Sequence, residues 1–255
     1  MAQRVAQGPS YQTRALSRAL AILDLFSEEC RTLAVKDIHA RLGIPKPTIV
    51  RLASLLESEG YLRRHDAGYS IGPKALHLGS LYARDNALID LSREPLEQLA
   101  ARTFQTASLA KLAGSRIVHV VVAGSSRPVR HVKQAGTLGL PHATGVGKAI
   151  LSRLPLEAVD RIMGEEPYQV LTPKTITRRK ALLAELERVR EAGYAVDDEE
   201  TAPGLKCCAV PVAVTEADAT AISLSGPAGE FDDAAIRDYV AALERTADAI
   251  RSSFA

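Results

Sequence analysis

Three short helical stretches followed by a hairpin, all within residues 13–73, constrain the fold more than any other feature of this sequence. Apolar residues recur at helical spacing over 13–28, 34–42 and 46–59. The segment Gly43-Ile44-Pro45 between the second and third helices is short, and its glycine is well placed to end the second helix. The spacing therefore predicts a helix-turn-helix preceded by one further helix.

A basic hairpin is predicted directly after the third helix. The β-prone runs 61–63 and 69–71 flank the turn-prone Asp66-Ala67-Gly68, and Gly60 ends the helix before them. Three helices and a hairpin in this order predict a winged helix-turn-helix.

The apolar positions also predict which side of each helix is buried. The first helix has one apolar face, made by Leu16, Leu20, Leu23 and Phe26. The third helix has an inner face made by Ile49, Leu52, Ala53 and Leu56.

The third helix is expected to enter the major groove of DNA, where base pairs are distinguishable by their hydrogen-bonding edges. With Ile49 toward the core, Arg51 falls on the outer side, and Arg51 is the best candidate for a base or phosphate contact. The alternative is that the charged residues of this helix and of the hairpin are ordinary solvated charges on a three-helix domain. The predicted DNA-contacting residues are Lys46, Pro47, Thr48, Arg51 and Ser54 on the helix and Arg63 and Arg64 on the wing.

Composition agrees with a basic N-terminal part on a larger body. The 255 residues are 46% hydrophobic, which is enough for two ordinary domains. Residues 1–86 hold 12 lysines and arginines against 8 aspartates and glutamates, a net charge of +4. Since the whole chain has a net charge of +2, the remaining residues carry −2. We see no membrane-spanning run and no signal-peptide core, and therefore expect a cytoplasmic protein. Three cysteines without CxxC or HxxxH spacing predict no metal and no cofactor.

The remainder of the chain predicts a second domain of mixed helices and strands. We expect a winged helix-turn-helix over 1–73, a linker helix over 74–86 within a helical pattern that runs to 104, and a second domain over 87–255. Strands at both ends with helices between them favour an α+β fold with a largely antiparallel sheet. The predicted strands are 106–112, 116–124, 128–134, 194–198, 206–214 and 219–225, and the predicted helices are 145–153, 155–163, 178–192 and 232–252.

Two segments of the second domain have the chemistry of a small-molecule site. Thr144 can cap a helix that begins at Gly145-Val146-Gly147, whose free N–H groups would favour an anion. The alternative is a tight turn that lets a helix pack closely. Ala149 stands where a phosphate-binding P-loop needs Ser or Thr, so that motif is excluded.

In the run from 221 to 226, Ser223 and Ser225 share one strand face and can offer hydroxyls to a polar ligand. A solvent-facing strand surface is the alternative. Asp197 follows two apolar residues at a strand end, and without a ligand it would be a cap or a surface carboxylate. Cys207 and Cys208 face opposite sides, so one of them is expected to fill the core.

With these segments in view, the chain resembles the IclR family over nearly its whole length. The resemblance implies a GAF/profilin-like α+β effector-binding domain, and dimers or tetramers on palindromic operators. It further implies a repressor or activator of catabolic genes that responds to a small organic, keto or aromatic acid. The segments that carry it are 42–62 (LGIPKPTIVRLASLLESEGYL), 140–151 (LPHATGVGKAIL), 193–200 (GYAVDDEE), 204–212 (GLKCCAVPV) and 221–227 (AISLSGP).

By this similarity, Gly145, Val146, Asp197, Leu205, Cys207, Ser223 and Ser225 match effector-lining positions. The chain departs from the family pattern at Pro47, which lacks the usual small hydroxyl or alanine, and at Val146, which is bulkier than the usual alanine.

Two other functions stay open on the sequence alone. Cys207, His142 and Asp197 include the residue types of a nucleophilic enzyme, although no nucleophile signature surrounds the cysteine. A DNA-binding protein whose second domain only oligomerises would give the glycine loop and the serine pair purely structural roles.

Overall fold

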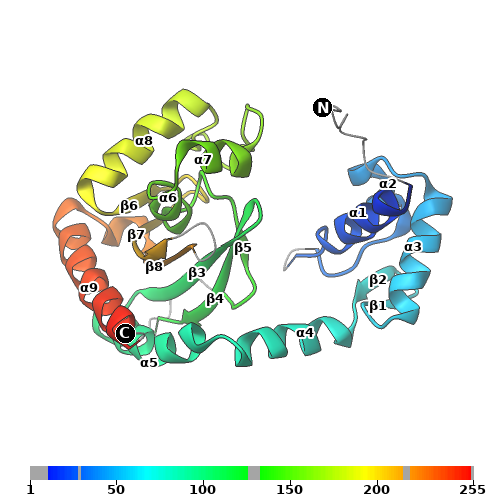
Figure 1. The fold of residues 1–255 in the computed structure, drawn as a ribbon, viewed down its shortest axis with the longest axis horizontal. Coiled ribbons are helices and arrows are strands. Elements are labelled where there is room, and N and C mark those ends of the chain that lie inside the picture. Colours follow the sequence, from blue (N-terminus) through cyan, green and yellow to red (C-terminus); the bar gives the residue numbers. More distant parts are fainter. Residues whose placement is uncertain (1–10, 28–29, 126–132, 215–218, 254–255) are drawn as a thin grey trace, which may run out of the picture. The chain divides into compact units, whose positions relative to one another are not determined.

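The computed structural model describes residues 11–27, 30–125, 133–214 and 219–253, and the chain divides into two compact units, Met1–Asp85 and Asn86–Ala255 (Figure 1). The described residues include no helix that is long and apolar enough to cross a membrane. They also include no cluster of three or more His, Cys, Asp or Glu side chains that would hold a metal ion.

The first unit is a winged helix-turn-helix, as its sequence predicts. Its core is formed by Ile22, Leu33, Ile38, Ile49, Leu52, Ala53, Leu62 and Tyr69, with Leu56 packed against them. The wing is an antiparallel hairpin with Leu62 opposite Ile71, and Leu33 forms a further bridge to Tyr69. The elements are α1 (Tyr11–Leu23), α2 (Val35–Leu42), α3 (Lys46–Ser58), β1 (Leu62–His65), β2 (Gly68–Ile71) and α4 (Pro73–Arg84).

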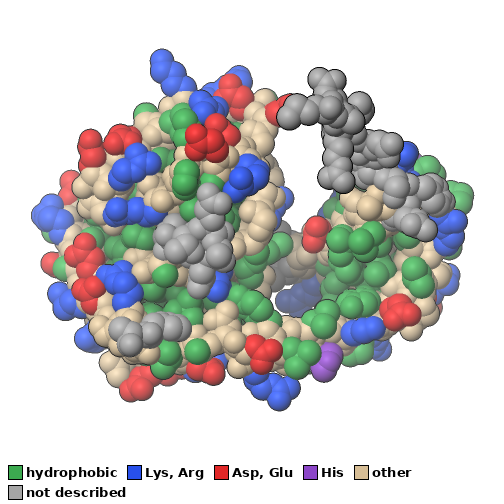
Figure 2. Space-filling model, in the orientation of Figure 1, with side chains coloured by type: hydrophobic (Ala, Val, Ile, Leu, Met, Phe, Trp, Pro, Cys, Tyr) green, Lys and Arg blue, Asp and Glu red, His purple; other side chains and the backbone are tan. Residues whose placement is uncertain are grey.

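The first helix differs from its prediction in length and in orientation. It ends at Leu23 instead of residue 28, because the chain turns there with short-range bonds such as that from the Phe26 N–H to the Leu23 carbonyl. Leu16 is 61% exposed and Leu20 52%, whereas Ile22 is fully buried. Leu23 and Phe26 of the predicted face pack against the core together with Ala15 and Ala19, so Leu16 and Leu20 are the part of that face that stays on the surface. Figure 2 shows hydrophobic side chains gathered on the surface of this unit.

The second unit is an α+β domain built on a six-stranded sheet of order β5-β4-β3-β8-β7-β6, in which every neighbouring pair is antiparallel. This confirms the predicted fold class. Its strands are β3 (Thr106–Ala113), β4 (Arg116–Ala123), β5 (Leu138–Gly139), β6 (Ala195–Asp198), β7 (Leu205–Val214) and β8 (Ala219–Pro227). Its helices are α5 (Ala87–Thr103), α6 (Gly145–Leu151), α7 (Leu156–Met163), α8 (Arg179–Ala192), a 3₁₀ turn η1 (Ala228–Glu230) and α9 (Asp233–Ser252).

The predicted and observed elements differ at three places in the second unit and the helix before it. Most of the predicted strand 128–134 lies outside the described residues, and its last two residues, Lys133 and Gln134, are not in a strand. The short strand β5 was not predicted, because two residues give no periodic signal. The helical pattern over 74–104 is interrupted between α4 and α5, where Asn86 has an extended backbone.

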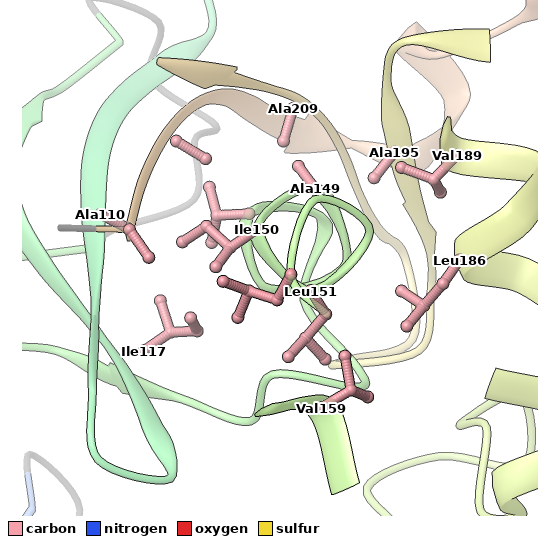
Figure 3. Close-up of a cluster of buried hydrophobic side chains, with 14 of the residues drawn as sticks. Ala110, Ile117, Ala149, Ile150, Leu151, Val159, Leu186, Val189, Ala195 and Ala209 are labelled. Carbon is pink, nitrogen blue, oxygen red and sulfur yellow. The ribbon is translucent and has the colours of Figure 1, made fainter. Parts of the chain in front are cut away.

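The two faces of the sheet are covered by different helices. Helix α6 packs on one face, with its Ala149, Ile150 and Leu151 among strand residues and the α8 side chains Leu186 and Val189 (Figure 3). Helices α5 and α9 pack on the other face, where α9 buries Ile236, Val240, Leu243, Ala247 and Ile250. Because strand side chains alternate, the α6 face is lined by every second residue: Ala195 and Asp197, Cys207 and Ala209, Ala221, Ser223 and Ser225, and Ser108 and Ala110.

Candidate functional site

The turn between α2 and α3 is held by local interactions that the sequence supplies. Gly43 has a φ of +64°, which a residue with a side chain rarely adopts, and its N–H donates to the His39 carbonyl. The ring of His39 bonds back to the Ile44 carbonyl through Nδ1, at 2.7 Å. This turn therefore fixes the angle at which α3 leaves the domain.

Helix α3 presents the predicted face to solvent. Lys46, Pro47, Arg51 and Ser54 are exposed, Thr48 is half-buried, and Ile49, Leu52 and Ala53 are buried on the other side. Pro47 occupies the second helical position, where the missing N–H would have had no partner within the helix. The exposure fits the expected outer face, and contact of these residues with DNA stays a prediction.

Two arginines that the sequence reasoning missed lie beside this face. Arg14 and Arg18 of α1 line a hollow of about 150 Å³ together with Thr48 and Arg51 of α3. The signal was present, since arginines four residues apart share one side of a helix. The three arginines make the hollow electropositive, as a surface for phosphates would be.

The wing carries its two arginines on opposite faces of β1. Both Arg63 and Arg64 are exposed, and the Arg64 guanidinium carbon lies 5.9 Å from the centre of the Tyr69 ring on the partner strand. Arg64 therefore packs on its own hairpin, while Arg63 extends from the other side.

In the second unit, the α6 face of the sheet has an apolar half and a polar half. The polar half is centred on three strands, where Ser108, His119 and Ser223 are all at least 98% buried. The Ser108 hydroxyl lies 3.1 Å from the His119 Nδ1 and 3.0 Å from the Ser223 Oγ. Ser225 is also buried, so the solvent-facing alternative for the serine pair is wrong. Sequence reasoning missed Ser108 and His119, although alternation along the predicted strand 106–112 places Ser108 on the same face as Thr106 and Ala110.

Cys207 and Asp197 adjoin this polar half from β7 and β6, where they are directly opposite each other. Asp197 is 2% exposed, and burial raises the pKa of its carboxyl. Its Oδ1 accepts the Glu200 N–H at 2.7 Å, and its Oδ2 accepts the Thr201 hydroxyl. Asp197 therefore caps the turn after β6, which is the role expected of it without a ligand.

The loop before α6 joins the polar half at Gly145. A Cβ on Gly145 would lie 3.1 Å from the Cys207 sulfur, so the glycine lets α6 approach β7. Val146 packs in the apolar core, so its side chain does not line the polar half. Leu205, at the start of β7, is half-buried.

Gly147→Ala is expected to lower the free energy of unfolding by about 1–2 kcal/mol, because overpacking outweighs the better helix propensity of alanine. A Cβ on Gly147 would lie 2.3 Å from the Pro141 carbonyl oxygen, and backbone does not move aside cheaply. Urea denaturation measures the difference. Gly229→Ala is the matched control, since a Cβ there meets nothing within 4 Å. Equal stability of the two variants would show that the loop relaxes.

Cys207 is expected to react far more slowly with iodoacetamide at neutral pH than a catalytic thiolate does. Burial raises the pKa of its thiol to about 11, so the nucleophilic thiolate is almost absent. His142 of the enzyme hypothesis instead bonds the Gln169 carbonyl through Nε2. Peptide mass spectrometry would follow the labelling, with the half-buried Cys30 as the internal comparison. Labelling of Cys207 ahead of Cys30 would contradict this expectation.

Two lysines carry no role in the sequence prediction of the site. Lys148 of α6 is 1% exposed, but its ammonium is bound by the carboxylates of Glu200 and Glu185. Lys133, which precedes β5, is half-buried; burial lowers its pKa, whereas Cys207 and Asp197 act to raise it. The sequence reasoning placed Lys133 in the predicted strand 128–134 and gave it no role in the site.

A basic winged helix-turn-helix joined to an α+β domain with a buried polar patch defines a DNA-binding regulator with a separate effector-binding domain. Two family profiles match the chain: "IclR helix-turn-helix domain" over residues 15–66 and "Bacterial transcriptional regulator IclR C-terminal" over residues 81–252. The chain belongs to the IclR family of transcriptional regulators, whose members are not enzymes.

Similar proteins agree with this assignment over almost the whole chain. The HTH-type transcriptional regulator BhcR of Paracoccus denitrificans is 33% identical over 87% of this chain and 80% of its own length. The acetate operon repressor of Salmonella typhimurium is 26% identical over 95% of this chain and 90% of its own length. The crystal structure of an IclR regulator from Alicyclobacillus acidocaldarius superposes with a TM-score of 0.78 at 27% identity, covering 95% of this chain and 99% of that one.

Proposed function

We propose that this regulator changes its affinity for an operator when a small organic acid binds in the polar half of the α6 face. The observation that carries this proposal is the buried polar patch itself. Four side chains there, Ser108, His119, Ser223 and Ser225, are at least 98% buried beside an apolar core. Buried polar groups cost free energy, and a sheet face that only needed to be packed would be apolar throughout.

The effector would contact the patch and the segments around it. Ser223 and Ser225 supply hydroxyls, Gly145 and Val146 offer backbone N–H groups, and Asp197 has remaining lone pairs beyond those that hold its turn. The proposed effector-lining residues are Gly145, Val146, Asp197, Leu205, Cys207, Ser223 and Ser225, to which the structure adds Ser108 and His119.

The operator would be bound by the exposed side of α3 and by the wing. Lys46, Pro47, Thr48, Arg51 and Ser54 would meet the major groove, and Arg63 and Arg64 would meet the adjacent backbone or minor groove. The hollow lined by Arg14, Arg18 and Arg51 would receive a phosphate.

The functional species would be a homodimer or a pair of dimers in the cytoplasm. Helix α1 exposes Leu16 and Leu20, and α4 exposes Leu76, Leu81 and Tyr82, with Leu76 at 75%. Apolar side chains in such numbers on two helices fit burial against a second copy. The effector would shift the population between two spacings of the DNA-binding units, with α4 transmitting the change.

The test is binding of the purified full chain to a fragment of its own promoter, with and without candidate acids, at fixed salt. We expect at least one small carboxylate to change the operator affinity severalfold, which makes the two sites coupled. Ser223→Ala should weaken the response to the acid and keep the affinity for DNA. If no preference for the promoter over random DNA is found under any of these conditions, the proposal is wrong. Operator binding that no metabolite changes would instead favour a purely oligomerising second domain.

A further inference from the structure

A hollow in the second unit lies outside both sites described above. We call it the His142 hollow; its lining residues come from the turn between β3 and β4, the loop before α6, the end of α7 and the connection that follows α7. Its volume is about 200 Å³, below the roughly 300–1,000 Å³ of sites for drug-sized molecules, so it has room for a small ligand only. It shares no residue with the polar half of the α6 face.

One lining residue is a buried imidazole with an unused nitrogen. His142 is 2% exposed, and its Nε2 lies 2.9 Å from the Gln169 carbonyl oxygen. A carbonyl only accepts hydrogen bonds, so the ring carries its proton on Nε2. Burial lowers the pKa of His142, and the charges of Arg116 and Lys148 lower it further against the effect of the Gln169 bond, so the ring is neutral at ordinary pH. Its Nδ1 is therefore an acceptor, and it is buried without a hydrogen-bond partner in the described part of the chain.

Two opposite charges line the same hollow without pairing. Arg116, at the start of β4, and Glu165, just after α7, are both exposed lining residues. Within the described ranges, neither forms an ion pair, whereas the neighbouring Arg179 and Asp160 are paired at 2.7 Å. Unlike charges that are held apart across a hollow complement a ligand that carries one charge of each sign.

The rest of the lining is largely apolar. Ile162 and Met163 of α7 line the hollow, together with the buried ring of Tyr168. The Tyr168 ring packs on the His142 ring, with 5.3 Å between the two ring centres, and so helps to hold the imidazole in place. Such a lining can cover an aliphatic group, but it cannot compensate a charge.

We propose that the His142 hollow binds a small apolar α-amino acid. Its carboxylate pairs with Arg116, its ammonium pairs with Glu165 and donates to the His142 Nδ1, and its side chain covers the apolar lining. A simple carboxylate would leave Glu165 and the Nδ1 without a donor, and a simple amine would leave Arg116 without an anion. The inference concerns a second site with a different ligand class, so it does not rest on the effector proposed for the polar half.

Calorimetric titration of the full chain at neutral pH tests the ligand class. The probes are L-alanine, L-valine, L-leucine and L-methionine, each compared with the carboxylate that lacks its ammonium and with the amine that lacks its carboxylate. We expect at least one amino acid to bind and both of its fragments to bind about tenfold more weakly or worse, because each fragment loses a charge-assisted contact.

Three substitutions test the location. Arg116→Ala and Glu165→Gln change exposed side chains, so the fold should be kept, and each should weaken the amino acid by about tenfold or more. His142→Gln keeps an N–H for the Gln169 carbonyl and removes the Nδ1 acceptor, so it should weaken binding as well. Arg237→Ala, which removes an exposed arginine from α9, is the matched control and should bind the amino acid normally.

The possible results separate this site from the polar half. An amino acid that binds Arg116→Ala and Glu165→Gln as tightly as the unaltered protein overturns the location, and loss of its binding in Ser223→Ala alone would place it in the polar half instead. A carboxylate fragment that binds as well as its amino acid overturns the ligand class. If none of the four amino acids binds at millimolar concentration, the inference is wrong and water is the partner of the Nδ1. Each of these results leaves the acid effector of the proposed function standing.

Discussion

Arg51→Ala is expected to weaken operator binding by about 1–3 kcal/mol, that is, by about 5- to 150-fold. Arg51 is exposed on the outer side of α3, opposite the buried Ile49 and Leu52, and borders the hollow shared with Arg14 and Arg18. A guanidinium in that position contacts either a base edge or a phosphate. Fluorescence anisotropy with a labelled promoter fragment, at one fixed salt concentration, measures the loss.

The salt dependence tells the two kinds of contact apart. A phosphate contact should weaken binding to promoter and random DNA alike and should reduce the salt slope by about 1. A base contact should affect the promoter fragment alone. Arg237→Ala, which removes an exposed arginine from α9 in the other unit, is the control and should change nothing. An Arg51→Ala protein with full operator affinity would mean that α3 does not lie in the groove as proposed.

The elements that the sequence predicted well are those in which local pattern and tertiary packing agree. Helix α3 buries Ile49, Leu52 and Ala53 as its spacing indicates, and β8 alternates so that Ser223 and Ser225 share one face. The apolar residues of α1 were assigned to one helical face, but the spacing alone could not predict which of them the core would bury. Spacing marks a face as apolar without telling how much of it the core covers, and here Leu23 and Phe26 pack on the core whereas Leu16 and Leu20 do not.

The candidate effector site shows a similar division. The glycine loop and the serine pair were found from local patterns along one element, whereas Cys207 was assigned through the family resemblance. Ser108 and His119 were missed because they join the site only when β3 pairs with β8 and with β4. Single-sequence patterns report neighbours along one element, whereas these contacts link residues up to 115 positions apart, as between Ser108 and Ser223.

Lys148→Met is expected to lower the free energy of unfolding by about 3–5 kcal/mol, which is the usual effect of removing one partner from a buried ion pair. Lys148 is 1% exposed, and its ammonium binds Glu200 of the turn after β6 and Glu185 of α8. The substitution leaves Glu200 without a cation, and its Oε2 already has no hydrogen-bond partner. Glu185 keeps the guanidinium of Arg188 at 2.8 Å. The loss of stability is therefore expected to come mainly from the unpaired Glu200 carboxylate.

The pH dependence of this loss has a definite sign. Burial raises the pKa of Glu200, while Lys148 acts to lower it, so removal of the lysine raises that pKa further. A carboxyl whose pKa is raised in the folded state favours folding at low pH, and this contribution is lost as the pH rises through the raised pKa. The deficit of Lys148→Met should therefore be largest above that raised pKa and shrink as the pH falls toward the ordinary glutamate value of 4.5.

A second substitution shows whether the stranded carboxylate is the cause. Glu200→Gln in the Lys148→Met background removes the buried charge and should recover much of the lost stability at neutral pH, which a double-mutant cycle by urea denaturation measures. If the double variant is as unstable as Lys148→Met alone, lost packing of the lysine stem explains the effect better than charge.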